Sequence, residues 1–164
     1  MHCQIKFGYC KTMLLSKSIA VYLNLAGCKL KQYTSAMLKE SNIDLTPEQF
    51  LLIDLLWNQG AMSQQAMADT MHKDKNSITN LADQLEKKGL VMRVKDVLDR
   101  RSNILTLTEK AEVLKSEAKE TGILMLDHMI EGIGEDELNA FLETLDKMSA
   151  NMDRYASLQS GSRG

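Results

Sequence analysis

The chain has 164 residues and a formal net charge of −2 at pH 7, and it is 44% hydrophobic with 5% aromatic residues and one proline. This length fits one domain or two small, closely packed ones, and the scarcity of proline and aromatic residues favours long helices over a β-sandwich. The charge excludes a uniformly basic nucleic-acid-binding protein, and polar residues interrupt the stretch from Met13 to Leu30 too often for it to cross a membrane.

The charges are unevenly distributed along the sequence. Residues 1–44 contain six basic and two acidic side chains, and residues 73–101 contain eight basic and five acidic ones. Residues 108–155 contain five basic and twelve acidic side chains. Positive charge is therefore concentrated in two blocks, whereas the C-terminal part is strongly acidic.

The first predicted element is a long helix, because apolar residues recur at helical spacing from Leu15 to Met37. The sequence "SNIDL" ends it. Thr46 is then a predicted N-cap, with Pro47 in the first turn and Gln49 placed to complete a capping box. The helix that they start, residues 47–58, is apolar nearly all round, so we expect it to be central and buried.

Two shorter helices follow. Ser63 is predicted to cap a helix over Gln64–Met71, and Asp74 to cap a helix that continues to Lys88. Gly89 is suited to end the second helix, since glycine readily takes the left-handed conformation found there. The apolar residues of this helix recur at i, i+3, i+4 and i+7, and they are Ile78, Leu81, Ala82 and Leu85.

The next predicted element is a β-hairpin, in which "LVMRVK" and "SNILTLT" are strands joined by "DVLDRR". Thr108 is predicted to cap a long helix that continues to about Glu131. "GIGEDE" interrupts the chain, and a last helix has apolar residues at helical spacing up to Tyr155. The small, polar residues 157–164 are predicted to be a disordered tail.

Three short helices followed by a hairpin are the element order of a winged helix-turn-helix. The face of the helix 74–88 opposite its apolar residues carries side chains that suit DNA, although an ordinary solvated helix face has the same pattern. Asparagine can bond adenine, threonine can contact a thymine methyl, and lysine can reach guanine or phosphate. The residues on and beside this face are Asn76, Asn80, Asp83, Lys87, Thr79 and Gln84.

Cations flank this face on two sides. Lys73 and Lys75 lie at the N-terminus of the helix, where backbone N–H groups also attract phosphate. Arg100 and Arg101 lie at the hairpin tip, and arginine is attracted to a narrow minor groove. A solvated turn is the alternative for the tip when the hairpin is considered by itself.

Three stretches of the sequence closely resemble the MarR family of bacterial regulators: "LTPEQFLLIDLLW", "MSQQAMADTMHKDKNSITNLADQLEKKGLVMRV" and "DVLDRRSNILTLTEKA". The resemblance implies a mainly α fold with a small β-hairpin wing. It implies a homodimer that binds a pseudo-palindromic operator, with a recognition helix at Asp74–Lys88 and a wing at Val94–Asn103. It also implies that the N- and C-terminal helices of two subunits intertwine.

We therefore divide the chain into an N-terminal dimerisation helix (1–44), a winged helix-turn-helix DNA-binding domain (45–107), C-terminal dimerisation helices (108–156) and the tail. The long apolar stripes of the outer helices also favour a dimer, with packing inside a six-helix monomer as the alternative. The predicted DNA-binding residues are Lys73, Lys75, Asn76, Ser77, Thr79, Asn80, Lys87, Arg100 and Arg101. Of these, we expect Asn76, Thr79 and Asn80 to read bases, and Lys75 and Lys87 to contact phosphate.

Two residues of the predicted recognition helix depart from what DNA binding would favour. Many family members have arginine where this chain has Asn80, so the operator cannot be copied from relatives. Asp83 faces the predicted DNA side, where phosphate repels a carboxylate. We expect Asp83 to pair with a cation or to lie at the edge of the groove.

The resemblance also implies an effector pocket where the helical dimer meets the winged core, near Tyr22, Ala26, Trp57 and Met71. The 11 methionines suit such a pocket, although most fit a core at helical spacing. Cys10 and Cys28 cannot be aligned with oxidant-sensing cysteines of relatives, and a free thiol is the simpler interpretation of each. An alternative is a sensor site formed by a histidine and a carboxylate from different helices.

We expect no enzyme, metal or cofactor, because no nucleophile–base pair, glycine-rich phosphate loop or metal-ligand spacing occurs. Three cysteines without a pairing pattern favour the reducing cytoplasm. The sequence thus predicts a dimeric transcriptional regulator, acting as a repressor that a small-molecule effector or oxidation releases from DNA. A winged-helix module that binds only proteins, and a small-molecule-binding enzyme, are the alternatives.

Overall fold

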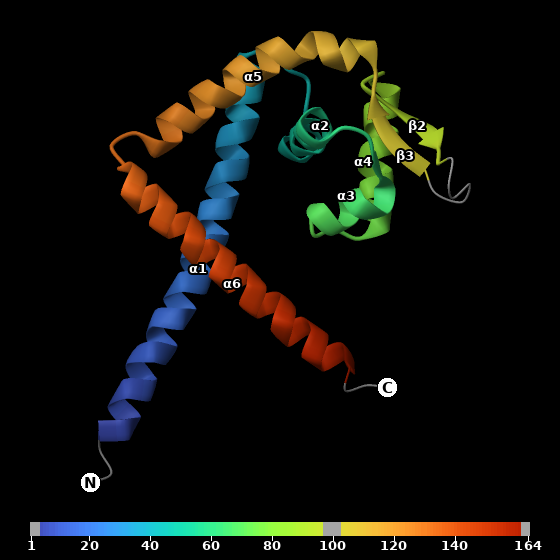
Figure 1. Cartoon of the computed structure of the whole chain (residues 1–164). Coiled ribbons are helices and arrows are strands. Elements are labelled where there is room, and N and C mark those ends of the chain that lie inside the picture. Colours follow the sequence, from blue (N-terminus) through green and yellow to red (C-terminus); the bar gives the residue numbers. More distant parts are fainter. Residues whose placement is uncertain (1–3, 97–102, 162–164) are drawn as a thin grey trace. The chain divides into compact units, whose positions relative to one another are not determined.

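The computed structural model describes residues 4–96 and 103–161, and in them it has six helices and three short strands (Figure 1). The predicted mainly α fold with a small β-hairpin is confirmed. The chain divides into two compact units, Met1–Met125 and Leu126–Gly164, which are described separately. In chain order the elements are α1 (Gln4–Glu40), α2 (Pro47–Gln59), β1 (Met62–Ser63), α3 (Gln64–Thr70), α4 (Lys75–Lys87), β2 (Val91–Lys95), β3 (Asn103–Leu107), α5 (Glu109–Ile130) and α6 (Glu135–Gly161).

Helix α2 begins at the predicted capping box. The Gln49 backbone N–H donates to Thr46 Oγ1, and the Thr46 backbone N–H donates to Gln49 Oε1, both at 3.2 Å. Each bond satisfies an N–H group that a helix start leaves without a partner. The helix ends at Gly60, whose φ of 80° is a left-handed conformation that glycine adopts without strain.

The prediction that α2 is buried nearly all round is wrong for one side of the helix. Leu52 and Ile53 are fully buried, whereas the Leu51 side chain is 47% exposed. In this chain the neighbours of α2 cover one stripe of it, because α1, α4 and β3 contact the helix over part of its circumference.

Helices α3 and α4 have the predicted polar caps. The Ala66 backbone N–H donates to Ser63 Oγ at 3.0 Å, and the Ser77 backbone N–H donates to Asp74 Oδ1 at 2.9 Å. All four predicted apolar residues of α4 are buried. Gly89, with φ of 71°, follows the end of α4 as predicted and turns the chain into β2.

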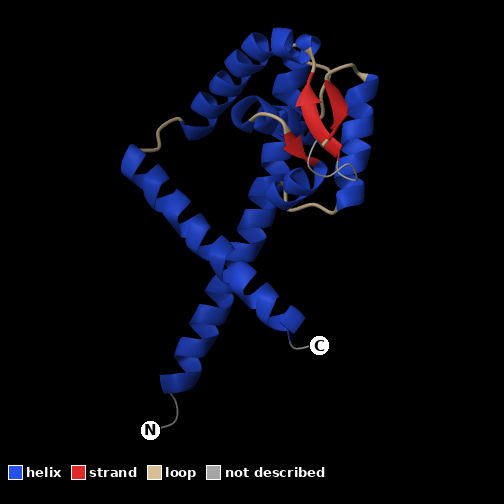
Figure 2. Cartoon of the chain, turned by 45° about the vertical axis from the view of Figure 1, so that its right-hand side comes forward, coloured by secondary structure: helices blue, strands red, loops and turns tan. Residues whose placement is uncertain are grey.

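The three strands form one antiparallel sheet in the order β1-β3-β2 (Figure 2). Met62 of β1 and Arg93 of β2 both pair with Leu105 of β3. Strand β1 was not predicted, because two residues are too few to show an alternating pattern. The predicted hairpin tip, with Arg100 and Arg101, lies outside the described residues.

One hydrophobic core joins α2, α3, α4 and the sheet. Its fully buried side chains come from all of these elements, so the helices and the wing strands are packed as one body. They include Leu52, Ile53, Met67, Ile78, Leu85 and Leu105.

Helix α5 begins as predicted at Thr108, whose Oγ1 accepts a hydrogen bond from the Ala111 backbone N–H at 3.3 Å. In the second unit α6 continues to Gly161, so the predicted disordered tail is wrong for residues 157–161. No proline or internal glycine interrupts this stretch, and Ser157 Oγ donates to the Arg154 carbonyl at 2.9 Å. No described helix is long and apolar enough to span a membrane.

We expect Leu52→Ala to lower the free energy of unfolding by about 2–5 kcal/mol, because it leaves a cavity in the core that α2 shares with α4 and β3. Urea denaturation at fixed protein concentration measures the free energy of unfolding of each protein. The matched control is Leu51→Ala in the same helix, which removes the same atoms from an exposed site. Equal losses in the two variants would contradict the described core.

Candidate nucleic-acid interface

Helix α4 presents one exposed polar face. Because Ile78, Leu81, Ala82 and Leu85 are buried, the opposite side of the helix is turned to solvent. Asn76, Asn80 and Lys87 are exposed on that side, and Lys75 is exposed in the first turn. These side chains provide amide donors and acceptors and two cations, the groups that suit base edges and phosphates.

The N-terminus of α4 is capped by a carboxylate. Asp74 accepts the Ser77 hydroxyl at 2.6 Å and the Ser77 backbone N–H at 2.9 Å. These bonds from Ser77, the side-chain bond first, hold the pKa of Asp74 below its ordinary value. The Ser77 hydroxyl proton is thus used inside the chain, so the predicted role of Ser77 at DNA would require this cap to rearrange.

The two lysines predicted at this end of α4 differ in their surroundings. Lys73 is half-buried, and its Nζ lies 3.0 Å from Glu48 Oε1 of α2. Lys31 of α1 reaches the same oxygen at 3.3 Å. The bond from Lys73 is the largest cause of a lowered pKa of Glu48. Lys73 therefore links the turn that precedes α4 to α2, whereas Lys75 in the first turn of α4 is exposed.

Asp83 is paired with a cation, one of the two situations expected for it. Arg93 Nη2 of β2 lies 2.7 Å from Asp83 Oδ1 and donates to the Thr79 carbonyl at 3.1 Å. Its Nη1 donates to Glu86, and its backbone N–H donates to the same carboxylate at 3.1 Å. Arg93 is not among the residues predicted from the sequence. Strand alternation puts it on the same side as buried Val91, and a cation on that side needs an anionic partner.

A second polar chain connects the wing strands to α4. Lys95 Nζ donates to Asn103 Oδ1 at 2.9 Å, and Asn103 Nδ2 donates to Gln64 Oε1 at 3.4 Å. Buried Gln64 in turn donates to Thr79 Oγ1 at 3.4 Å. Thr79 Oγ1 also donates to the Lys75 carbonyl at 2.9 Å. Thr79, a predicted base reader, is thus half-buried at the junction of α3, α4 and β3.

The family model described as "MarR family" matches residues 45–103, which include α2, α3, α4 and the strands β1 and β2. The HTH-type transcriptional regulator YfiV of Bacillus subtilis is 31% identical over 128 residues, which cover 76% of this chain and 80% of the relative. The chain belongs to the MarR family. The HTH-type transcriptional regulator MhqR of the same organism is 29% identical over 111 residues, covering 68% of this chain and 77% of MhqR.

A solved structure of CouR, a transcriptional repressor, bound to a 23-mer DNA duplex matches this MarR-family chain with a TM-score of 0.72 and 28% identity. The match covers 82% of this chain and 94% of the other. CouR from Rhodococcus jostii RHA1 bound to p-coumaroyl-CoA matches with a TM-score of 0.70 and 26% identity, covering 82% and 93% of the two chains. This chain is accordingly a MarR-family transcriptional regulator with a winged-helix fold.

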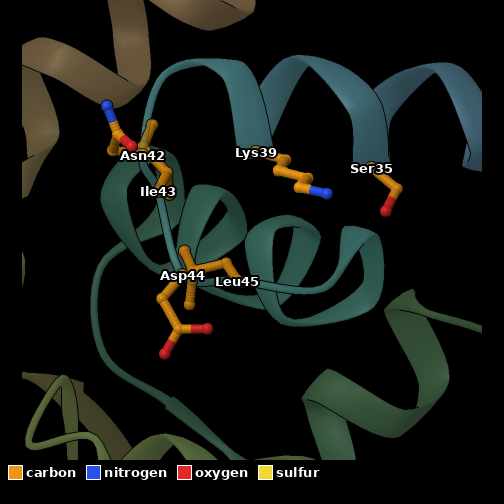
Figure 3. Close-up of a pocket in the computed structure, with 6 residues that line it drawn as sticks. All are labelled: Ser35, Lys39, Asn42, Ile43, Asp44 and Leu45. Atoms are coloured by element: carbon orange, nitrogen blue, oxygen red, sulfur yellow. The ribbon is translucent and has the colours of Figure 1, made fainter.

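The four residues predicted at an effector pocket are not brought together in either of two hollows of this MarR-family chain. The first lies where α1 turns towards α2, with Ser35 and Lys39 projecting from α1 and residues 42–45 forming the loop (Figure 3). The second lies between α1, the start of α2 and α4; it is lined by Lys31, Gln32, Ser35, Thr46, Pro47, Glu48, Leu81 and Gln84.

The predicted pocket residues lie in two different environments. Tyr22 is 73% exposed and Ala26 is also exposed, both on α1. Trp57 and Met71 pack partly buried against the core, and Trp57 Nε1 is buried with no hydrogen-bond partner among the described residues.

Metal ligands and reactive thiols do not form a recognisable site in the part of the chain that is described. Among those residues no group of three or more His, Cys, Asp or Glu side chains could hold a metal ion. Cys28 is an exposed free thiol on α1, and the side chain of Cys10 lies outside the described residues.

We expect Glu48→Gln to lower the free energy of unfolding near neutral pH. The pKa of Glu48 lies below its ordinary value of 4.5, so its ionised form stabilises the folded chain. A carboxyl with a depressed pKa contributes stability above its unfolded pKa and loses the contribution as pH falls through the folded pKa. The two proteins should therefore differ most near neutral pH and converge once the pH has fallen below the folded pKa of Glu48.

Urea denaturation at a series of pH values measures this difference. Glu117→Gln is the matched control, because Glu117 is exposed on α5, and its effect should be small throughout. A Glu48→Gln effect that stays constant down to low pH would rule out the proposed role of the Lys73 and Lys31 pairs.

Proposed function

We propose that the chain is a homodimeric repressor that binds a pseudo-palindromic operator in duplex DNA and leaves it when a small-molecule effector binds or a thiol is oxidised. The observation that carries the proposal is the exposed polar face of α4, held beside the wing strands in a MarR-family winged helix. The CouR repressor that resembles this chain is bound to DNA in its solved structure, which supports the same role here.

Within this proposal, the residues of α4 have different roles. Asn76 and Asn80 are exposed on the side of α4 away from the core and are the proposed base readers. Lys75 and Lys87, which are also exposed, contact phosphates. Thr79 contributes to base reading through its methyl group, since its hydroxyl is already bonded to Gln64 and Lys75.

The wing tip supplies Arg100 and Arg101 to the minor groove in this proposal. Both lie in the sequence between β2, which Arg93 bonds to α4, and β3. A narrow minor groove attracts arginine by its concentrated negative potential.

The proposed dimer is supported by apolar side chains that the single chain leaves exposed. Such side chains occur on α1, on the C-terminal half of α5 and along α6, and exposed apolar surface of this extent marks an interface. They are Ile19, Val21, Tyr22, Leu23, Leu25 and Leu30 on α1, Ile123, Leu124, Leu126 and Met129 on α5, and Phe141, Leu142, Met152, Tyr155 and Leu158 on α6.

For the effector we propose a site at the junction of α1 with the winged core, near Trp57 and Met71, to which Tyr22 and Ala26 contribute. The buried Nε1 of Trp57, which has no hydrogen-bond partner among the described residues, supports this proposal, because a buried donor without a partner costs free energy that a ligand acceptor would recover. The structure of CouR with p-coumaroyl-CoA is a precedent for a ligand in a similar fold.

We expect Asn80→Ala and Lys87→Ala to affect DNA binding in different ways. Loss of a base contact relaxes preference at one symmetric pair of operator positions, each mismatch being worth roughly 1–3 kcal/mol. Loss of a phosphate contact weakens binding to all sequences alike and lowers the salt slope by about one phosphate per subunit. Selection from a randomised duplex pool measures the sequence preference, and salt titration of binding then measures the salt slope.

Asn80→Arg adds the side chain that many family members carry and should shift preference towards guanine, whose O6 and N7 suit arginine. The same enriched motif for wild type and Asn80→Ala would show that Asn80 does not read a base. Wild-type protein without affinity for any duplex would instead favour a winged-helix module that binds only proteins.

We expect Leu142→Asp to convert the dimer into monomers at micromolar concentration, because it places an unpaired charge in the proposed interface. Light scattering measures the mass of the particle. The matched control is Asn139→Asp, which adds the same charge at an exposed polar position of α6 and should leave the dimer intact. A wild-type monomer would remove the dimer and the palindromic operator together.

A further inference from the structure

Arg93 of β2 bonds three residues of α4 that lie one above another along the same side of the helix. Thr79, Asp83 and Glu86 are spaced at i, i+4 and i+7, so they form one stripe along α4, and all three bond Arg93 of β2. The guanidinium bonds the Thr79 carbonyl and both carboxylates. The fork of Arg93 therefore spans two turns of the helix from a single strand residue.

The attachment uses both the backbone and the side chain of β2. The Arg93 backbone N–H donates to Glu86 Oε1 at 3.1 Å, while its guanidinium bonds Glu86 Oε2. The Arg93 side chain is only 19% exposed, and charge-assisted hydrogen bonds are stronger away from water. Sliding of β2 along α4 would break these bonds together.

We propose that Arg93 is a positioning residue for DNA binding: it sets the distance and angle between the base-reading face of α4 and the wing. The inference rests on the proposed function, in which α4 and the wing contact neighbouring grooves. DNA contacts made by α4 and the wing at the same time require a fixed spacing between these two elements. An error of about an ångström in this spacing is enough to weaken DNA recognition.

The second polar chain supports this role because it ends at the same turn of α4. Gln64 bonds the Thr79 hydroxyl and Asn103 of β3, whereas Arg93 bonds the Thr79 carbonyl from β2. Two separate attachments from two strands resist rotation of the wing about either one. The arrangement also pairs Asp83, whose carboxylate would otherwise repel DNA beside Asn80.

Loss of positioning and loss of charge predict different ratios of operator affinity to random-duplex affinity when the two carboxylates are neutralised. The double variant Asp83→Asn, Glu86→Gln removes two negative charges beside the reading face, so charge by itself predicts tighter binding to every duplex. It also removes the ionic anchors of Arg93. Charge by itself therefore leaves the ratio of operator affinity to random-duplex affinity unchanged, whereas this ratio must fall if Arg93 is a positioning residue.

The experiment uses the full-length dimer with wild type, this double variant and Arg93→Lys. Arg93→Lys keeps the charge but cannot form the fork, so we expect an unchanged salt slope and a loss of about tenfold in the operator-to-random ratio. The probes are a fluorescent duplex of the selected operator and the same duplex with scrambled sequence. Lys119→Met, at an exposed site of α5, is the control for loss of a remote charge.

Amide hydrogen exchange tests the attachment without DNA. We expect faster exchange in β2 and the C-terminal half of α4 in Arg93→Lys, with α2 and α5 unchanged. The positioning role would be overturned if both variants kept the wild-type ratio of operator affinity to random-duplex affinity. It would also be overturned if Arg93→Lys exchanged its amide hydrogens at wild-type rates. A wild-type protein that selects no duplex would overturn the proposed function, and hydrogen exchange would then show by itself whether Arg93 holds β2 to α4. Glu86→Gln replaces the double variant if that protein does not fold.

Discussion

The burial of one apolar stripe of α4 decides which side chains this protein offers to a partner. Ile78, Leu81, Ala82 and Leu85 all lie in the core shared with α2, α3 and β3. A rotation of α4 by one residue would bring either Asn80 and Gln84 or Asp83 and Glu86 into that core, and burying an unbonded amide or carboxylate costs several kilocalories per mole. The exposed position of Asn76, Asn80 and Lys87 follows directly from this constraint.

Polar bonds then hold α4 on each of its packed sides. Gln49 completes the capping box of α2, and its amide Nε2 donates to Gln84 Oε1 of α4 at 2.7 Å. Gln64 reaches Thr79 from α3, and Arg93 reaches α4 from β2. The same capping residue thus starts one helix and orients another, and the reading face of α4 stays exposed to solvent.

The pairing of charges in the winged core reconciles a net charge of −2 with the proposed binding to DNA. Asp83 and Glu86 pair with Arg93, and Glu48 pairs with Lys73 and Lys31. Asp44 pairs with Lys88 at 3.0 Å. Because these carboxylates face cations of their own chain, exposed Lys75 and Lys87 can attract phosphates with less local repulsion.

The sequence by itself determined the helices, their caps and the buried side of α4, because helical spacing and capping residues act over a few neighbouring positions. It also allowed the family to be recognised. Strand β1, the exposure of Leu51, the continuation of α6 to Gly161 and the contacts of Lys73 and Arg93 were decided only by the tertiary structure. Arg93 and Glu86 are neighbours because the turn at Gly89 folds β2 back along α4, and no local pattern states which carboxylate a strand arginine will meet. The ionic partners of Lys73 and Arg93 lie on other elements, so their roles depend on how those elements pack.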